Sequence, residues 1–311
     1  MFLIKRLLIL IFIALLVALI SFTVFKIYKN TNSDTTLISP LPPGQTTATI
    51  PTPTLPTHLS SNLGEKVEEA LTGTRGTYGI AIKNLKTGEF YYAHEQKIFE
   101  AASLYKLWIM ATAYDQIEKG TLKEDQTMSQ DIKVLNEKFK IATESAETTE
   151  GKITLSVQDA LEQMITISHN DAALLLSEKV RLKNVTTFLK ENSFTKSSLG
   201  EPPKTTAYDI ALFFEKLYNR NLANPESTNI MLDLLKKQTL NHKLPKYLPK
   251  STIIAHKTGE IGPFTHDAGI AYTPNGDYII AVLSESNSPR AAEERIANIS
   301  QAVFDYFSKK Q

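Results

Sequence analysis

Residues 103–111 read Ser103-Leu104-Tyr105-Lys106-Leu107-Trp108-Ile109-Met110-Ala111. They open an apolar run that continues to about residue 118 and ends at Gly120, which predicts a buried helix. A lysine in the first turn of such a helix is unusual for packing alone, because lysine is rarely fully buried. The segment therefore predicts a core helix and a chemical use for its first polar residues.

Ser103 and Lys106 are spaced i and i+3, so a helix places both side chains on one face. A serine hydroxyl is a poor nucleophile until a base removes its proton. A lysine can act as that base if burial and neighbouring cations lower its pKa, and the positive end of the helix dipole favours developing negative charge. The alternative is a capping serine with a solvated lysine, since the same spacing recurs at Ser193 and Lys196.

Ser168-His169-Asn170 falls at the junction of two apolar segments that we expect to be helices. Polar side chains at such a junction can project into a space between lobes. Ser168 could relay a proton to a leaving nitrogen, and Asn170 could hold a substrate amide and the lysine. The alternative is a helix N-cap, which the same residue types also serve.

Lys257-Thr258-Gly259 ends a strand-like run. A strand at the edge of a site can present Lys257 and the Thr258 hydroxyl to a substrate carboxylate, and Gly259 lets another backbone approach closely. The same tripeptide occurs at residues 86–88, where a hairpin turn explains it fully.

The wider pattern places strands on both sides of a helical middle. We expect strands at 77–84, 90–93, 252–255, 268–273 and 278–284, and further helices at 156–167, 171–181, 207–217, 225–236 and 291–307. Asn275-Gly276 is a tight hairpin turn between the last two strands. The predicted fold class is α+β: one antiparallel sheet built from both ends of the domain and flanked by helices, plus an all-helical lobe.

The N-terminal part predicts a membrane anchor. Residues 7–25 carry no charge, and a span of roughly 20 apolar residues crosses a bilayer. Lys5 and Arg6 precede them, which favours a cytoplasmic tip and an extracytoplasmic domain. A cleaved signal peptide is the alternative. We expect residues 1–29 to form the tip and anchor, 30–58 a Pro/Thr-rich linker, and 59–311 a single-pass protein's catalytic domain at the cell membrane.

Composition excludes several other classes. The chain has no cysteine, so disulfides, a thiol nucleophile and cysteine-based zinc sites are ruled out. The formal charge is +1 and no basic stripe is present, so we expect no nucleic-acid partner. The six histidines are scattered, with no acidic partner at ligand spacing. We predict no metal and no cofactor, and a monomer.

Only one combination of the three motifs runs in order along the chain, from Ser103 through Ser168 to Lys257. This ordered set resembles the class A β-lactamases among the penicillin-recognising serine hydrolases. Thr205-Thr206-Ala207 is similar to that family's segment after its Ω loop, and residues 266–276 resemble its last hairpin. The resemblance covers nearly all of residues 60–311 and implies a β-lactamase/transpeptidase-like fold.

The resemblance also implies roles in forming an acyl-enzyme. Ser103 would attack an amide or β-lactam carbonyl, and Lys106 would accept its proton. Ser168 would pass a proton to the leaving nitrogen. Asn170 would position Lys106 and the substrate.

Substrate binding would fall to the last motif and the residue after it. Lys257 and Thr258 would bind the substrate carboxylate beside Gly259. The backbone N–H groups of Ser103 and Glu260 would form the oxyanion hole, whose donors are worth about 3–4 kcal/mol each in comparable hydrolases.

Two departures from the family pattern bear on function. His169 stands where class A enzymes usually have Asp, and is expected to be structural or to modulate the pKa values of the site. The Ω loop is shortened to residues 199–204, with Glu201 as the candidate base for deacylation or, alternatively, a solvated side chain. A site that acylates but deacylates slowly would suit a penicillin-binding D,D-peptidase acting on peptidoglycan stem peptides. A non-catalytic surface binding domain is the third alternative.

Overall fold

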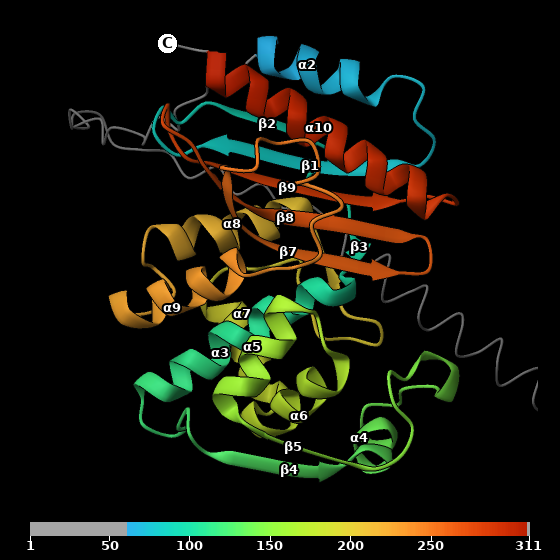
Figure 1. The fold of residues 1–311 in the computed structure, drawn as a ribbon, viewed down its shortest axis with the longest axis vertical. Helices are drawn as coiled ribbons and strands as arrows, with labels where there is room; N and C mark the ends of the chain where they lie inside the picture. The colour runs from blue at the N-terminus through green and yellow to red at the C-terminus, as the bar shows by residue number, and fades with distance from the viewer. Residues whose placement is uncertain (1–60, 310–311) are drawn as a thin grey trace, which may run out of the picture. The chain divides into compact units, whose positions relative to one another are not determined.

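The computed structural model describes residues 61–309, and strands from both ends of this region meet in one sheet (Figure 1). The order is β2-β1-β9-β8-β7, with every neighbouring pair antiparallel. The strands are β1 (Thr77–Asn84), β2 (Phe90–Ala93), β7 (Ile253–Ile261), β8 (Phe264–Tyr272) and β9 (Tyr278–Glu285). The edge strand β7 faces the helical lobe (Figure 1).

Two helices from opposite ends of the described chain cover one face of the sheet. They are α2 (Ser61–Leu71) and α10 (Pro289–Lys309), which pack on each other (Figure 1). Ile80, Ile280 and Val282 of the sheet form one buried cluster with Ile296 and Ile299 of α10. Because α8 (Ala207–Tyr218) covers the other face, the strands are buried on both sides and their sequences are near-continuous apolar runs.

The helices of the second lobe surround α3 (Lys106–Glu118), whose residues from Lys106 to Tyr114 are all buried. The 3-10 turn η1 (Ala102–Tyr105) leads into it. The remaining helices are α4 (Ile132–Lys138), α5 (Val157–Thr166), α6 (Asn170–Val180), α7 (Leu182–Glu191), α8 (Ala207–Tyr218) and α9 (Pro225–Lys236), with a short 3-10 turn η2 (Thr143–Ser145). Ser156, Thr206 and Asn224 cap α5, α8 and α9 through their side chains.

Two small sheets complete the fold. β3 (Phe99–Glu100) pairs with β6 (Lys204–Thr205) just before η1. β4 (Thr127–Asp131) pairs with β5 (Lys152–Ser156) at the end of the helical lobe far from the main sheet (Figure 1). The first of these pairs ties the segment before Ser103 to the loop that carries Glu201.

The predicted α+β architecture is confirmed, with corrections in detail. The predicted helix at 103–118 begins as the 3-10 turn η1, and its α-helical part starts only at Lys106. β7 runs on to Ile261 and β8 begins at Phe264, because the two strands form one long hairpin. The helices α2, α4 and α7 and the β4–β5 pair are additions that the sequence patterns did not predict.

The predicted anchor and linker lie outside the described residues. Between residues 61 and 309, no helix is both long enough and apolar enough to cross a bilayer.

Candidate active site

The turn that carries Ser103 packs directly against the edge strand β7. An added Cβ at Gly259 would lie 3.2 Å from Ala101 O and 3.3 Å from Ala102 Cβ. These contacts are tight enough that only glycine permits the approach without a shift of the turn. The contact brings two of the three predicted motifs together, although they are far apart in the sequence.

Lys106 is fully buried, and its Nζ is the centre of the site. Nζ donates to Ser168 O at 2.6 Å, to Ser168 Oγ at 3.2 Å and to Asn170 Oδ1 at 2.7 Å. Burial lowers the pKa of Lys106 to about 7, and the charge of Glu147 partly offsets this. In the described part of the chain no hydrogen bond joins Nζ to Ser103 Oγ, and such catalytic contacts often tighten only when substrate binds.

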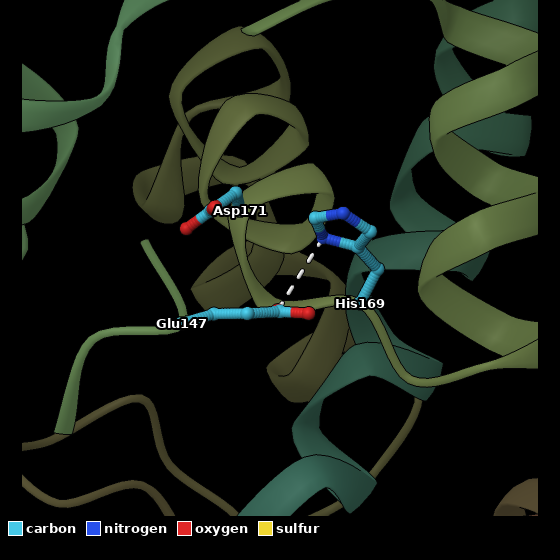
Figure 2. Close-up of side chains that lie close together, drawn as sticks. All are labelled: Glu147, His169 and Asp171. Carbon is cyan, nitrogen blue, oxygen red and sulfur yellow. Dashed lines mark ion pairs between the residues drawn. The ribbon is translucent and has the colours of Figure 1, made fainter. Parts of the chain in front are cut away.

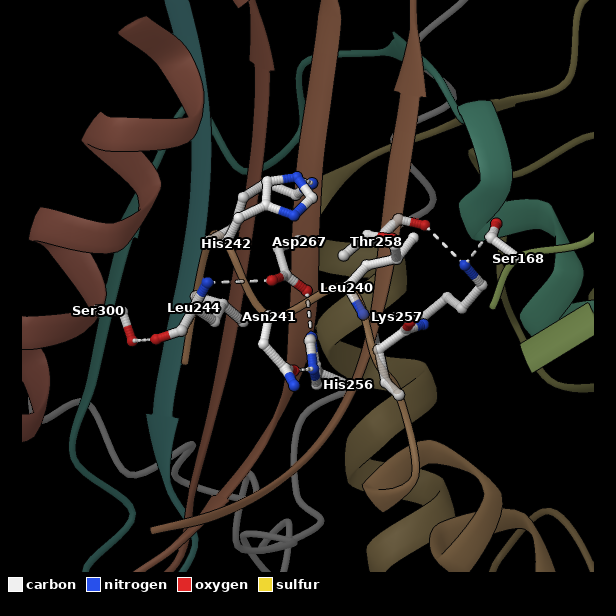
Figure 3. A network of polar contacts seen from close by, with 12 residues as sticks. Ser168, Leu240, Asn241, His242, Leu244, His256, Lys257, Thr258, Asp267 and Ser300 are labelled. Carbon is white, nitrogen blue, oxygen red and sulfur yellow. Dashed lines mark hydrogen bonds and ion pairs between the residues drawn. The ribbon is translucent and has the colours of Figure 1, made fainter. Parts of the chain in front are cut away.

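Lys257 reaches the same serine from the sheet. Its side chain is fully buried, and Nζ donates to Ser168 Oγ at 2.9 Å and to Thr258 O at 3.0 Å (Figure 3). Burial lowers the pKa of Lys257 well below its ordinary value, and the positive charge of Lys106 lowers it further. The hydroxyl of Ser168 therefore lies within hydrogen-bond distance of two lysine nitrogens, one from each lobe.

Two residues of the site hold left-handed backbone conformations. φ is 61° at Ser168 and 44° at Ala102, the residue before Ser103. A non-glycine residue in this region costs about 1–3 kcal/mol, and such conformations gather at functional sites where the surrounding structure holds them. No sequence signal predicted the left-handed backbone at either position, because both are ordinary residue types.

His169 caps α6, which is the structural role among its two predicted alternatives. Its Nδ1 accepts from the N–H of Ala172 at 3.4 Å. The same nitrogen lies 3.4 Å from Glu147 Oε2 (Figure 2). The ring therefore joins the start of α6 to the loop that contains Glu147.

Glu147 belongs to the site but was missed by sequence reasoning. Its Oε2 accepts from the N–H of Asn170, and its charge acts on Lys106. Next to it, Thr148 Oγ1 donates to the buried carboxylate of Asp171. Glu147, His169 and Asp171 are close enough to hold a cation (Figure 2). Protein donors already engage both carboxylates. No local pattern could identify Glu147, because its partner Asn170 is 23 residues away in the sequence.

The histidines beside the site have partners that spacing did not predict. His256 Nδ1 lies 2.9 Å from Asp267 Oδ1, and its Nε2 lies 3.1 Å from Asn241 Oδ1 (Figure 3). The β7–β8 register supplies Asp267, which pairs with Thr258. His266 is also fully buried, and burial lowers its pKa to about 4, so this ring is neutral and structural.

The side chain of Glu260 points to a third buried lysine, Lys243. Its Oε1 accepts from Lys243 Nζ and lies 3.1 Å from His242 Nε2. The side chain of Lys243 is 0% exposed, whereas that of Glu260 is 45% exposed. Burial raises the pKa of Glu260, but the charge and hydrogen bond of Lys243 outweigh burial and leave the pKa below its ordinary value.

Glu201 lies apart from the buried cluster. Its side chain is 70% exposed and forms an ion pair with Lys140 at 3.0 Å. The loop itself is close to the nucleophile segment, since the N–H of Ala101 donates to Pro203 O at 2.7 Å. The backbone thus brings Glu201 near the site, but its carboxylate is engaged at the surface.

The arrangement combines the parts of nucleophilic acyl transfer. It holds a serine at a helix start, a buried lysine whose pKa is near neutrality, and a second serine between two lysine nitrogens. A lysine of this pKa can accept a proton near pH 7. The Ser168 hydroxyl, which is hydrogen-bonded to two lysine nitrogens, can pass a proton on.

Comparison with known proteins agrees with this chemistry. The profile of the β-lactamase enzyme family matches residues 62–307. The β-lactamase VEB-1 of Pseudomonas aeruginosa is 25% identical over 285 residues, which is 81% of this chain and 92% of the relative. The extended-spectrum β-lactamase PER-1 of the same organism is 23% identical over 273 residues, covering 80% and 88% of the two chains.

Solved structures share the fold. PBP-A superposes with a TM-score of 0.71 at 24% identity, covering 80% of this chain and 97% of PBP-A. A β-lactamase from Sphaerobacter thermophilus also reaches a TM-score of 0.71 at 24% identity, with 81% and 98% coverage. A variant of PBP-A was solved as an acyl-enzyme complex with penicillin G.

Proposed function

This chain belongs to the β-lactamase enzyme family, and we propose that it opens β-lactam amides through an acyl-enzyme on Ser103. The observation that carries the proposal is Lys106, which is buried, has a pKa near 7 and is hydrogen-bonded to both Ser168 and Asn170. A lysine in that state can act as a base at neutral pH, and Ser103 lies one turn before it.

Acylation begins with transfer of the Ser103 proton to Lys106. The hydroxyl oxygen attacks the lactam carbonyl, and the N–H groups of Ser103 and Glu260 receive the developing oxyanion. Asn170 accepts a hydrogen bond from Lys106 Nζ through its Oδ1 and so holds the base in place. The tight contact at Gly259 fixes the distance between the two oxyanion donors, because it fixes the turn against β7.

Collapse of the tetrahedral intermediate breaks the lactam C–N bond, and the leaving nitrogen needs a proton. Ser168 Oγ is the donor, since it is hydrogen-bonded to Lys106 Nζ and can be reprotonated from it. Lys257 holds the same oxygen from the other side and, with Thr258, binds the substrate carboxylate. The acyl group then remains on Ser103 until water attacks.

Nitrocefin turnover by the purified full chain tests this proposal, with intact-protein mass spectrometry after a short exposure to benzylpenicillin. We expect an adduct of one penicillin per chain on Ser103 and none on Ser103→Ala. Absence of any adduct and of any turnover in the wild type would refute the covalent mechanism.

A D,D-peptidase is the second candidate, and the position of Glu201 is the observation in its favour. A carboxylate that is 70% exposed and paired with Lys140 is poorly placed to activate a water at the acyl-enzyme. We expect Glu201→Gln to change the deacylation rate by less than about twofold, as for other exposed side chains. A loss of a hundredfold would identify Glu201 as the base. Release of terminal D-Ala from a stem peptide by the wild type would favour the peptidase.

We also propose that residues 7–25 anchor the enzyme and that 30–58 link them to an extracytoplasmic, monomeric domain. The support is the uncharged apolar run and the Pro/Thr-rich stretch after it. Membrane pelleting that resists carbonate extraction, compared with a chain lacking residues 1–29, tests the anchor. Recovery of the intact full-length chain in the soluble fraction would contradict it.

A further inference from the structure

The side chain of Glu260 forms an ion pair with Lys243 immediately after the Lys257-Thr258-Gly259 motif. Lys243 is fully buried, and its Nζ contacts Glu260 Oε1 and His242 Nε2, whose side chains are both half-exposed at 41–45%. A buried ammonium needs an anion or a set of acceptors beside it. On the exposed side of this pair, an incoming anion could therefore replace the Glu260 carboxylate as the partner of Lys243.

The pair lies on the Thr258 side of β7. Side chains alternate along a strand, so His256, Thr258 and Glu260 share one face. Asn241 Oδ1 lies 3.1 Å from His256 Nε2, and the N–H of Leu244 donates to Asp267 Oδ2 at 3.0 Å (Figure 3). The segment 241–244 therefore runs along this face. Asp267 is paired with Thr258, so the segment carrying Lys243 passes beside Thr258.

Lys243 is also close enough to act on the motif electrostatically. Its charge contributes to lowering the pKa of Lys257, after burial and the charge of Lys106, and the charge of Glu260 acts in the opposite direction. A carboxylate bound at Lys257 and Thr258 would therefore lie within the field of Lys243. It would also lie within the field of the Glu260 carboxylate, which repels it.

We propose that the Glu260 carboxylate is an internal counter-ion that competes with the substrate carboxylate for Lys243, and so determines specificity. Substrates with a free carboxylate beside the reacting amide are disfavoured until Glu260 leaves Lys243. Neutral substrates meet no such competition. The identity of the disfavoured group rests on the proposed function, which assigns carboxylate binding to Lys257 and Thr258.

A purely structural role is the rival explanation, in which Glu260 only neutralises a buried lysine. The two roles differ in what happens when the charge is removed. Glu260→Gln keeps the backbone N–H and an oxygen that can accept from Lys243. A structural role predicts equal effects on all substrates, whereas competition predicts a gain only for anionic ones.

The first measurement is the rate constant for Ser103 acylation of the full chain by nitrocefin and by its methyl ester. For Glu260→Gln we expect the ratio of the nitrocefin rate constant to the ester rate constant to rise by about tenfold, the size of one relieved like-charge contact, whatever the substitution does to both rates together through the oxyanion hole. Glu293→Gln is the matched control, because its Oε1 lies 3.8 Å from His242 Nε2 but forms no ion pair with Lys243 among the described residues. It should leave both rates unchanged. An unchanged ratio of the two rates in Glu260→Gln would overturn the proposal.

The second measurement separates this inference from the catalytic proposal. Benzylpenicillin binding is measured by calorimetry on Ser103→Ala and on Ser103→Ala with Glu260→Gln, where no acylation can occur. We expect the double variant to bind about tenfold more tightly. Equal affinities would overturn the inference even if the wild type acylates. Tighter binding without acylation of the wild type would uphold the inference and refute the serine mechanism.

A second variant covers the case in which Glu260→Gln does not fold. Lys243→Gln removes the cation and leaves Glu260 as an anion that still contacts His242 Nε2 at 3.1 Å. The nitrocefin-to-ester rate ratio should then fall below that of the wild type by about tenfold. A ratio equal to or above the wild-type value would contradict competition for Lys243.

Discussion

At the scale of single residues, the burial of Lys106 lowers its pKa, as the proposed mechanism requires, but also lowers the stability of the fold while the lysine is charged. Its Nζ is surrounded by uncharged acceptors on Ser168 and Asn170, and within residues 61–309 no carboxylate forms an ion pair with it. Burial therefore disfavours the ammonium form, which moves the pKa from 10.5 to about 7. The proposed role of Lys106 as a base depends on this shift, because it makes the free amine available near neutrality.

Lys106→Met is expected to abolish acylation and to stabilise the protein at acidic pH. Between pH 7 and 10.5 the unfolded chain binds more protons at this residue than the folded chain, so its contribution to stability rises with pH. Below pH 7 the whole penalty is present. The variant should gain on the order of 5 kcal/mol at pH 6, and the gain should vanish near pH 10.5. Chemical denaturation at several pH values measures this, and a gain that grew with pH would contradict the assignment.

Glu147 is the residue that keeps the pKa of Lys106 from falling further. Its charge raises that pKa, and its Oε2 fixes the N–H of Asn170. Glu147→Gln keeps an oxygen acceptor but removes the charge, so the acidic limb of the acylation pH profile should move to lower pH. Glu150→Gln, in the same exposed loop, is the control and should leave the limb in place. If the acidic limb were unchanged in Glu147→Gln, Glu147 would have no influence on the pKa of Lys106.

At the scale of elements, the contact between η1 and β7 is expected to align the N–H groups of Ser103 and Glu260, the two proposed oxyanion donors. Gly259→Ala would put a Cβ 3.2 Å from both Ala101 O and Leu104 Cγ, and the turn would have to move. A displacement of this kind can lower the rate by about a hundredfold. We expect such a loss in Ser103 acylation with a melting temperature within a few degrees of the wild type.

The control for this substitution is Gly200→Ala. Its Cβ would lie 3.5 Å from Pro202 O, an ordinary van der Waals contact, so acylation should be retained. Equal rates in the two alanine variants would show that the distance between η1 and β7 is not critical.

The strands and helices themselves were largely predictable, because their signals are local. Asn275-Gly276 lies at the β8–β9 turn, and α8 and α9 begin at Ala207 and Pro225, where their predicted ranges begin. The 3-10 geometry at Ser103 was not predictable, since it depends on β7 packing against the turn. The length of β7 also escaped prediction, because residues 256–261 include polar groups that only a partner strand and a second lobe could bury.

At the scale of the whole molecule, a well-packed helical core has to support the left-handed backbone conformations of Ala102 and Ser168 in the site. Phe213 is fully buried and lies between Phe194 and Phe214, with ring centroids 6.0 and 5.7 Å away. Phe213→Ala should lower the free energy of unfolding by about 3–5 kcal/mol. The acylation rate constant of the folded fraction should not change, since the Phe213 ring packs on other core rings and offers the site no hydrogen bond.

Val134→Ala is the surface control for this core substitution. Val134 is 44% exposed, so its truncation should cost less than about 0.5 kcal/mol. A similar loss of stability in both variants would mean that the helical lobe is not one packed core.

The sequence by itself determined the fold class and the order of the three motifs. Hydrophobic periodicity, capping residues and turn residues act over a few positions, so these local patterns alone place Ser103, Ser168 and Lys257 on a helix start, a helix junction and a strand. Only the tertiary structure decided which polar and charged groups meet. Glu147 beside Asn170, Lys243 beside Glu260 and Glu201 paired with Lys140 arise from loops and strand register. The reason is physical: burial and electrostatic coupling depend on distance in space, and residues far apart in the chain carry no local mark of the partner they will meet.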